Sequence, residues 1–142
     1  FDYLIDAIDG LTNKCLLLDE CRKQQIPIIT CGAAGGRRDG TAVRVADITR
    51  AKYDKLLFKV RKQLRQKHGF PRGTKKWQLP CVYSAESVQY PHPDGTVCED
   101  KPDSGESLKL NCEAGLGAAT HVTAAFGLAA AGHVAGEIAG MS

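Results

Sequence analysis

The alternation of apolar and polar positions along the chain predicts an α/β protein. Residues 2–9 contain a continuous apolar run, which is typical of a buried parallel strand. Apolar positions recur at helical spacing over residues 11–24, and Pro27 ends this helix because proline cannot continue it. Residues 28–31 form a second apolar run. A strand, a helix and a strand within about thirty residues make a βαβ unit, so we expect two parallel strands.

The rest of the chain predicts further strands and two more helices. Residues 41–48 alternate as a strand with one solvated face, and residues 82–90 are typical of another strand. Residues 91–112 indicate a loop, and residues 115–139 indicate a helix rich in Ala and Gly. Residues 51–68 predict a basic amphipathic helix whose apolar stripe consists of Leu56, Leu57, Val60 and Leu64.

The Ala/Gly-rich helix is not expected to span a membrane. It is uncharged from Gly115 to Gly136, but Ala and Gly supply little transfer free energy, and His and Thr side chains interrupt it. Gly132, Gly136 and Gly140 fall four positions apart, so another backbone can approach this face closely. Packing against the sheet and a subunit interface explain this spacing equally well.

Charge is distributed unevenly along a chain whose net charge is only +3. Residues 50–76 contain eleven Lys or Arg and a single acid, Asp54, so this segment carries +10. The remaining residues hold eight basic and fifteen acidic side chains, or −7. A basic block on an acidic body indicates a directed interaction with an anionic partner.

The start of the chain and its cysteines bear on cellular context. No signal peptide is visible, and the chain begins at Phe1 with a strand already under way, so we expect a preceding half-domain. Six cysteines is an even number, but Cys15 and Cys21 lie in a helical pattern and Cys31 ends an apolar run. Reduced thiols and a cytoplasmic location are therefore favoured over a disulfide framework.

A pair of acids lies at the carboxyl end of the first predicted strand, in the run D-A-I-D-G at residues 6–10. Open α/β sheets bind ligands at the carboxyl ends of their strands, where a carboxylate can reach a metal–phosphate group. From spacing alone, the favoured interpretation of Asp9 is an N-cap for the helix that starts at Leu11. The Gly-rich run at residues 32–36 matches neither the dinucleotide fingerprint nor a P-loop.

These motifs together resemble the superfamily of enzymes that adenylate carboxylates, and most closely its tRNA threonylcarbamoyladenosine dehydratase branch. The resemblance covers essentially the whole chain and is to the second half of these proteins. It implies that residues 1–142 form the C-terminal half of one adenylating domain, with a Rossmann-like open sheet, and that residues 50–76 form a tRNA-binding insertion. The motifs are D-A-I-D, G-A-A-G-G at 32–36, P-C-V-Y-S-A-E at 80–86, Y-P-H-P-D-G-T-V-C at 90–98 and N-C-E-A-G-L-G-A-A-T at 111–120.

The resemblance implies roles for three residues and two cofactors, ATP and Mg. Asp9 matches the acid that helps to hold Mg-ATP, and Lys14 matches a basic residue near the nucleotide. Cys112 matches the reactive thiol of the sulfur-carrier activators, and the nearby helix dipole favours its thiolate. A small buried hydrophobe is the alternative for Cys112, and Cys98 is a weaker candidate thiol. The family's nucleotide loop would precede Phe1.

No structural zinc is expected. Relatives with zinc carry C-x-x-C where this chain reads Cys81 to Ser84, and no C-x-x-C occurs anywhere in the sequence. Tetrahedral zinc needs four ligands, which usually come in such pairs. Cys81 is then expected to be a buried hydrophobic residue.

The basic segment favours RNA binding over a merely solvated helix face, because it holds almost no acid. Its candidate phosphate contacts lie along the helix and the following loop, with an aromatic side chain beside them as a platform for base stacking. The candidates are Lys52, Lys55, Lys59, Lys62, Arg65, Arg72, Lys75, Lys76 and Trp77.

The resemblance implies an ATP-dependent dehydration of threonylcarbamoyl-adenosine beside the tRNA anticodon. Adenylation of the carboxylate would precede ring closure, with water excluded, and Cys112 would be placed to accept the acyl group. The implied partners are tRNA, a second copy of the chain in a homodimer, and a sulfur-relay protein. Two alternatives stay open: a non-catalytic fragment for tRNA docking or dimerisation, and an activator of a ubiquitin-like sulfur carrier.

Overall fold

A four-stranded open sheet forms the centre of the molecule. The structure, a computed structural model, describes residues 1–92, 94–99 and 117–141. The strands lie in the order β1-β2-β4-β3; the first three are parallel and β3 is antiparallel to β4. This arrangement confirms the predicted α/β fold with a parallel start and mixed strands later. The strands are β1 (Leu4–Asp6), β2 (Ile28–Cys31), β3 (Val43–Asp47) and β4 (Pro80–Ser84).

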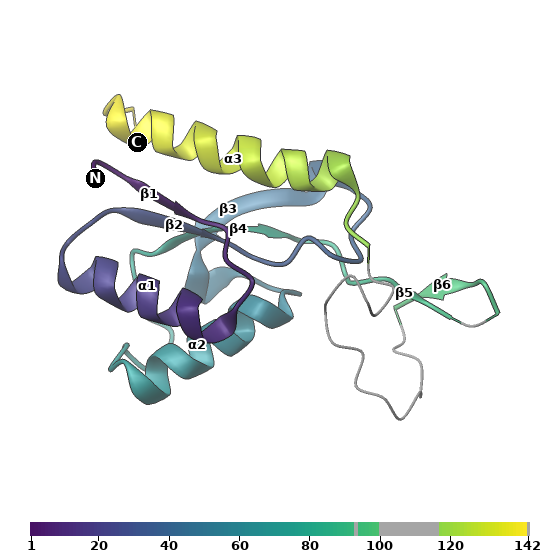
Figure 1. Ribbon diagram of the computed structural model, residues 1–142, viewed down its shortest axis with the longest axis horizontal. Coiled ribbons are helices and arrows are strands. Elements are labelled where there is room, and N and C mark those ends of the chain that lie inside the picture. Colours follow the sequence, from purple (N-terminus) through teal and green to yellow (C-terminus); the bar gives the residue numbers. More distant parts are fainter. Residues whose placement is uncertain (93, 100–116, 142) are drawn as a thin grey trace.

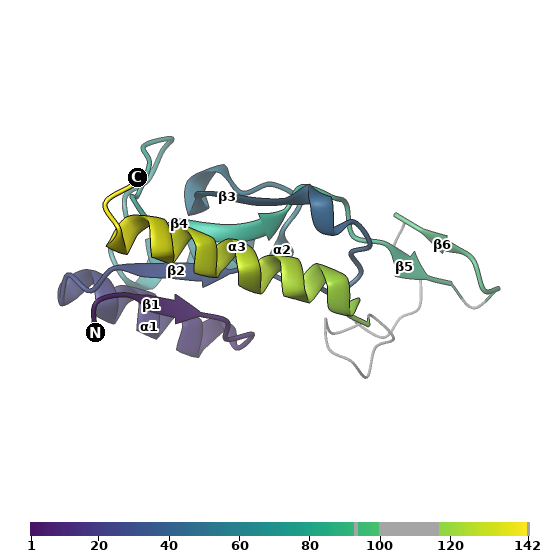
Figure 2. The ribbon, with the colours of Figure 1, turned by 90° about the horizontal axis from the view of Figure 1, so that it is seen from above.

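Helices cover both faces of the sheet (Figures 1 and 2). Helices α1 (Leu11–Lys23) and α2 (Lys55–Lys67) lie together on one face, and α3 (Thr120–Ile138) lies along the other. Short 3-10 helices, η1 (Gly40–Ala42) and η2 (Ile48–Arg50), flank β3. A hairpin of β5 (Tyr90–Pro91) and β6 (Val97–Cys98) projects away from the main sheet, as Figure 1 shows.

The sheet separates two apolar clusters. The larger cluster lies between the sheet and the helices α1 and α2, and it includes the buried side chains Leu18, Leu57 and Leu64. The smaller cluster joins Ile29 and Val82 of the sheet to the inner face of α3. The predicted stripe of the basic helix is therefore confirmed as its buried face, with Leu56 half-buried at its margin.

Several boundaries differ from the predicted ones because side chains redirect the backbone. The first strand ends at Asp6, whose Oδ1 accepts a hydrogen bond from the Ile8 N–H at 2.9 Å. The strand predicted over residues 82–90 is wrong beyond Ser84, where a turn begins and Ser84 Oγ accepts from the Glu86 N–H. The basic helix starts at Lys55 rather than four residues earlier.

The outward face of α3 carries the predicted glycine pattern. Val122, Phe126 and Ala130 of α3 are its buried residues. A Cβ built at Gly132 or Gly136 would meet no atom within 4 Å, so packing of these glycines against the sheet is wrong. The alternative, a subunit interface, stays a prediction. Among the helices that the structure describes, none combines the length and the apolar character that crossing a bilayer requires.

Candidate functional site

A buried ion pair fixes the turn at the end of β1. Asp6 Oδ2 lies 2.8 Å from Nζ of Lys14 in the first turn of α1, and neither side chain is exposed. Thr30 on β2 donates to the same oxygen at 2.6 Å, and Lys14 also donates to the Ile8 carbonyl at 2.9 Å. An unpaired charge would be costly at this depth, so these contacts hold β1, β2 and α1 together and position the turn before Asp9.

Asp9 itself is exposed just beyond this turn. The capping interpretation is wrong, because Gly10 is the N-cap of α1 and no side chain caps that helix. Among the residues that the structure describes, none forms a hydrogen bond or an ion pair with Asp9. An open carboxylate at the carboxyl end of a parallel strand fits Mg²⁺, which keeps several waters and takes one or two carboxylates besides nucleotide phosphates.

Lys14 does not offer its charge to a ligand, in contrast to what the resemblance implies. Its side chain is 0% exposed, and its ammonium group is held by Asp6 and Ile8. We therefore assign Lys14 to positioning the turn that carries Asp9. The D-A-I-D run was visible in the sequence, but the role of Asp6, its first acid, as the partner of a lysine on the next helix was not.

The Gly-rich loop after β2 packs against the start of α2. A Cβ at Gly32 would overlap the Asp54 carboxylate, so glycine is what lets these two segments approach. Asp54, the N-cap of α2, accepts hydrogen bonds from the Leu57 N–H at 2.8 Å and from the Ala33 N–H at 2.9 Å. Burial raises the pKa of Asp54 although these N–H groups and Arg37 favour its charged form. The loop thus fixes where the basic helix begins.

Arg37 holds the backbone just before α2. It is buried, and its Nη2 donates to the Tyr53 carbonyl at 2.5 Å. Tyr53 has a φ of 58°, in the left-handed region that bulky residues rarely adopt. On the other side of the loop, Glu86 accepts from the backbone N–H groups of Arg38 and Asp39 at 2.8 and 3.0 Å. The Gly-rich loop at 32–36 with the arginines that follow it, and Glu86 of the motif at 80–86, therefore together support the start of the basic helix.

The basic segment, residues 50–76, presents most of its predicted contacts to solvent. Arg65 is half-buried, and the segment's acid, Asp54, lies under the Gly-rich loop. Within residues 1–92, 94–99 and 117–141, no Lys or Arg of the segment forms an ion pair with a carboxylate. Its positive charge is thus available to phosphate groups. Among the predicted contacts, the exposed cations are Lys52, Lys55, Lys59, Lys62, Arg72, Lys75 and Lys76.

Trp77 is occupied by its neighbours. Its ring centroid lies 4.8 Å from that of Phe70, and the Arg65 guanidinium carbon lies 5.1 Å from the Trp77 ring centre. Its Nε1 donates to the Pro71 carbonyl at 3.2 Å. These contacts pack a half-buried ring against the protein, so base stacking by Trp77 stays a prediction that the geometry disfavours.

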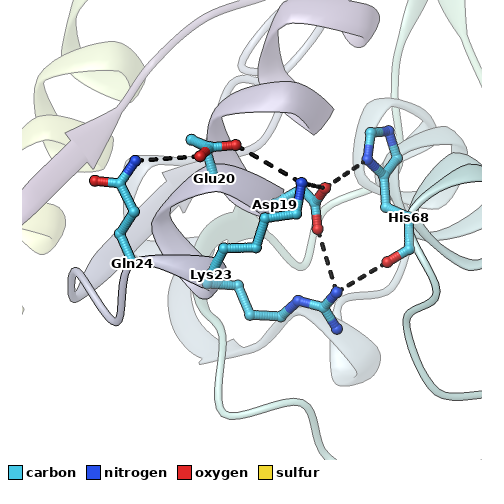
Figure 3. Close-up of polar contacts among 6 residues, drawn as sticks. Asp19, Glu20, Lys23, Gln24 and His68 are labelled. Carbon is cyan, nitrogen blue, oxygen red and sulfur yellow. Dashed lines mark hydrogen bonds and ion pairs between the residues drawn. The ribbon is translucent and has the colours of Figure 1, made fainter.

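A cluster of charged side chains joins the ends of α1 and α2 (Figure 3). The Asp19 carboxylate lies 2.9 Å from both His68 Nδ1 and Lys23 Nζ. Arg22 Nη2 donates to Asp19 at 3.2 Å and to the His68 carbonyl at 2.9 Å. These contacts between distant segments, which no pattern in the sequence indicated, join the end of the basic helix to α1.

The cysteines differ sharply in their surroundings. Cys15, Cys21, Cys31 and Cys81 are free thiols, and Cys98 is the other cysteine among the described residues. Burial raises the pKa of Cys15 to about 11 and that of Cys81 to about 12, which makes both inert. The half-buried Cys98 has its Sγ 2.9 Å from His92 Nε2, a thiol–imidazole contact typical of reactive cysteines. Cys112 lies outside the described residues, so its role stays a prediction.

Residues that could share a metal ion are scattered. Cys81 and Ser84 are both buried on β4. In the part of the chain that the structure describes, no three His, Cys, Asp or Glu side chains are placed to hold one ion. Any Mg²⁺ at this site would therefore be held by Asp9 together with the phosphates of a nucleotide.

The fold and the strand-end acid define one part of an open α/β domain of the kind that binds ligands at the carboxyl ends of its strands. No family model matches the chain. It is 40% identical over 134 residues to the tRNA threonylcarbamoyladenosine dehydratase of Escherichia coli K12. The aligned region covers 94% of this chain and 50% of that protein. It is 36% identical to the enzyme of that name from Haemophilus influenzae, over 94% of this chain and 49% of that protein.

Solved structures agree with this relationship. One described as TcdA (CsdL) superimposes with a TM-score of 0.85 at 37% identity, covering 99% of this chain and 50% of that one. The Escherichia coli tRNA N6-threonylcarbamoyladenosine dehydratase in complex with ATP superimposes with a TM-score of 0.79 at 33% identity, covering 99% and 49%. The chain belongs to the tRNA threonylcarbamoyladenosine dehydratase family, as the counterpart of its C-terminal half. It spans about half the length of the curated relatives it matches.

Proposed function

We propose that this chain is the tRNA-contacting half of an ATP-dependent tRNA threonylcarbamoyladenosine dehydratase. The observation that carries the proposal is the basic segment, whose cations have no carboxylate partners within the described ranges, on a chain 40% identical to an enzyme with that name. An acidic body with one unneutralised basic surface suits the phosphate backbone of a folded RNA.

In this proposal the strand-end turn serves the nucleotide. Asp9 holds Mg-ATP, and the buried pair of Asp6 and Lys14 keeps the turn that carries Asp9 in place. ATP supplies the leaving group that a free carboxylate lacks, so that the carboxylate of threonylcarbamoyl-adenosine can react within its own molecule with net loss of water. A relative is described as a complex with AMP, the fragment that such a reaction leaves.

Three further roles belong to the same proposal. Cys112 is the thiol that takes the acyl group from the adenylate as AMP leaves, and ring closure then releases the thiol. The outward glycines of α3, Gly132 and Gly136, offer a close-packed contact for a second copy of the chain. A sulfur-relay protein is a further partner of the enzyme.

ATP–pyrophosphate exchange tests the proposal against its alternatives. The enzyme would have the length of the relatives and carry this chain as its C-terminal half. We expect tRNA bearing threonylcarbamoyladenosine to stimulate exchange, and Asp9→Asn to abolish it, whereas the exposed Asp2→Asn control leaves it intact. Stimulation by a ubiquitin-like carrier protein instead would establish the carrier activator. Binding of tRNA with no exchange would leave a docking fragment.

A further inference from the structure

A hollow of about 640 Å³ lies beside the first turns of α2. Its volume falls in the range of about 300–1,000 Å³ that is usual for ligand pockets. We call it the α2 hollow, and its main lining residues are Lys52, Tyr53, Lys55, Phe58, Arg61 and Tyr90.

Two aromatic rings of the α2 hollow are open to solvent. The side chains of Tyr53 and Phe58 are 62% and 60% exposed. Aromatic rings of this size are usually buried, because their burial stabilises the folded state. Tyr53 keeps a left-handed backbone with a φ of 58°, and Arg37 anchors it there through the Tyr53 carbonyl. Strained backbone that the surroundings hold in place occurs mainly at functional sites, and at Tyr53 it keeps an aromatic ring exposed to solvent.

Three cations, Lys52, Lys55 and Arg61, line the same hollow as these rings. The Arg61 guanidinium carbon lies 6.0 Å from the centre of the Phe58 ring, and Lys55 Nζ lies 4.8 Å from the centre of the Tyr90 ring. Lys55 Nζ also contacts the Tyr90 hydroxyl. One exposed carboxylate, Glu99, lines the outer wall. Open aromatic faces among cations match an unpaired nucleotide, whose base has a π-face and whose phosphate is negative.

We propose that the α2 hollow binds one unpaired nucleotide of an RNA. Its base stacks on Tyr53 or Phe58, and its phosphate faces the neighbouring lysines, Lys52 and Lys55. The inference rests on the proposed binding of tRNA and adds the residues that recognise an unpaired base. The Trp77 ring already packs against Phe70 and Arg65, so we assign base stacking to the exposed rings of Tyr53 and Phe58 instead.

Two substitutions remove the rings without disturbing their supports. Tyr53→Asn keeps a residue that tolerates the left-handed backbone, and Phe58→Leu keeps an apolar, helix-forming side chain. Fluorescence anisotropy would measure the affinity of the chain for an RNA stem-loop and for a blunt duplex of the same stem. Base stacking predicts that the double variant binds the stem-loop roughly fivefold or more weakly. Its salt dependence and its affinity for the duplex should be unchanged.

The controls separate this inference from the proposed function. Leu128→Ala, on the exposed face of α3, should leave both affinities unchanged, and circular dichroism would verify that each variant is folded. Normal stem-loop affinity in the double variant would overturn the nucleotide site while tRNA binding stands. An equal loss on stem-loop and duplex would also overturn it, because the rings would not then recognise an unpaired base. A chain that binds neither RNA would instead refute the proposed function.

Discussion

Asp6 and Asp9 belong to one short motif, and the structure gives them opposite environments. Asp6 is 1% exposed and receives a lysine, a threonine hydroxyl and a backbone N–H, whereas Asp9 is exposed. Burial with full pairing makes the first acid structural, and exposure leaves the second available to a metal and phosphate. The motif therefore combines a support and a ligand-binding group in one turn.

The buried pair leads to a stability prediction. Lys14→Met would leave the Asp6 carboxylate buried without its cation, and breaking such a pair costs roughly 3–5 kcal/mol. We expect urea unfolding of this variant to show a loss of that size in the free energy of unfolding. Lys62→Met is the matched control, because Lys62 is exposed on α2 and should change stability little. Similar losses in both variants would mean that Asp6 and Lys14 do not form the pair described here.

Thiol reactivity gives a second prediction at this scale. Cys15 and Cys81 are buried, with pKa values of about 11 and about 12, so almost none of either is thiolate near neutral pH. Cys98 is half-buried and contacts the His92 imidazole at 2.9 Å. In iodoacetamide labelling at pH near 8 followed by peptide mass spectrometry, we expect Cys98 to react well before Cys15 and Cys81, and His92→Gln to slow it. Simultaneous labelling of all three would contradict these environments.

Helix α2 shows what local sequence can predict about an element and what it cannot. Its apolar stripe has the period of a helix, so its buried face was predictable. Its start was also encoded locally, because Asp54 caps the Leu57 N–H, but the second contact of Asp54, with the Ala33 N–H of a loop far away in the sequence, was not predictable. The position of its end depends equally on Asp19 and Arg22 of α1, which hold His68. Apolar periodicity carries no information about such polar contacts between distant segments.

The charged cluster that joins α1 and α2 predicts that the free energy of unfolding falls in acid. Burial would raise the pKa of Asp19, but hydrogen bonds and charges from Lys23 and His68 outweigh it and lower that pKa below its ordinary value. A lowered carboxyl pKa stabilises the folded state above the ordinary value of about 4, and this contribution is lost as the pH falls through the lowered pKa. Asp19→Asn should therefore reduce the free energy of unfolding at neutral pH and flatten its decline in acid.

Glu20, an exposed residue next to Asp19 on α1, provides the control for this prediction. Glu20 also contacts Lys23, at 3.7 Å, but its side chain is 57% exposed, so its charge is screened by solvent. Glu20→Gln should leave the pH dependence of unfolding unchanged, as measured by urea denaturation at several pH values. Parallel curves for Asp19→Asn and the original chain would exclude Asp19 as the link between the helices.

Across the whole molecule, the fold class was predictable but the site was only partly so. The parallel βαβ start follows from apolar runs that are close in sequence, and relatives confirm the fold. The insertion of β4 between β2 and β3 is non-local, and no periodicity encodes it. For the same reason the sequence indicated Trp77 as a stacking platform, although folding places it against Arg65 and Phe70. The exposed rings of Tyr53 and Phe58 were visible only in three dimensions.

The basic surface predicts a defined salt dependence of RNA binding. Each lysine that neutralises a phosphate adds roughly 0.7–0.9 to the slope of log affinity against log salt. If Lys52, Lys59 and Lys62 all contact phosphates, changing the three to Ala should flatten the slope for tRNA by about two units. Changing them to Arg keeps the charge and should preserve it. An unchanged slope in the Ala variant would reduce this helix face to a solvated surface.

The most direct measurement of the central claim is the mass of the modified nucleoside in tRNA. An enzyme of the relatives' length that carries this chain would be incubated with tRNA bearing threonylcarbamoyladenosine, and the nucleosides would be analysed by mass spectrometry. We predict the loss of one water from that nucleoside when ATP and Mg²⁺ are present, and no loss without ATP or with Asp9→Asn. An unchanged mass in the complete reaction, or a loss of water that is independent of ATP, would contradict this prediction.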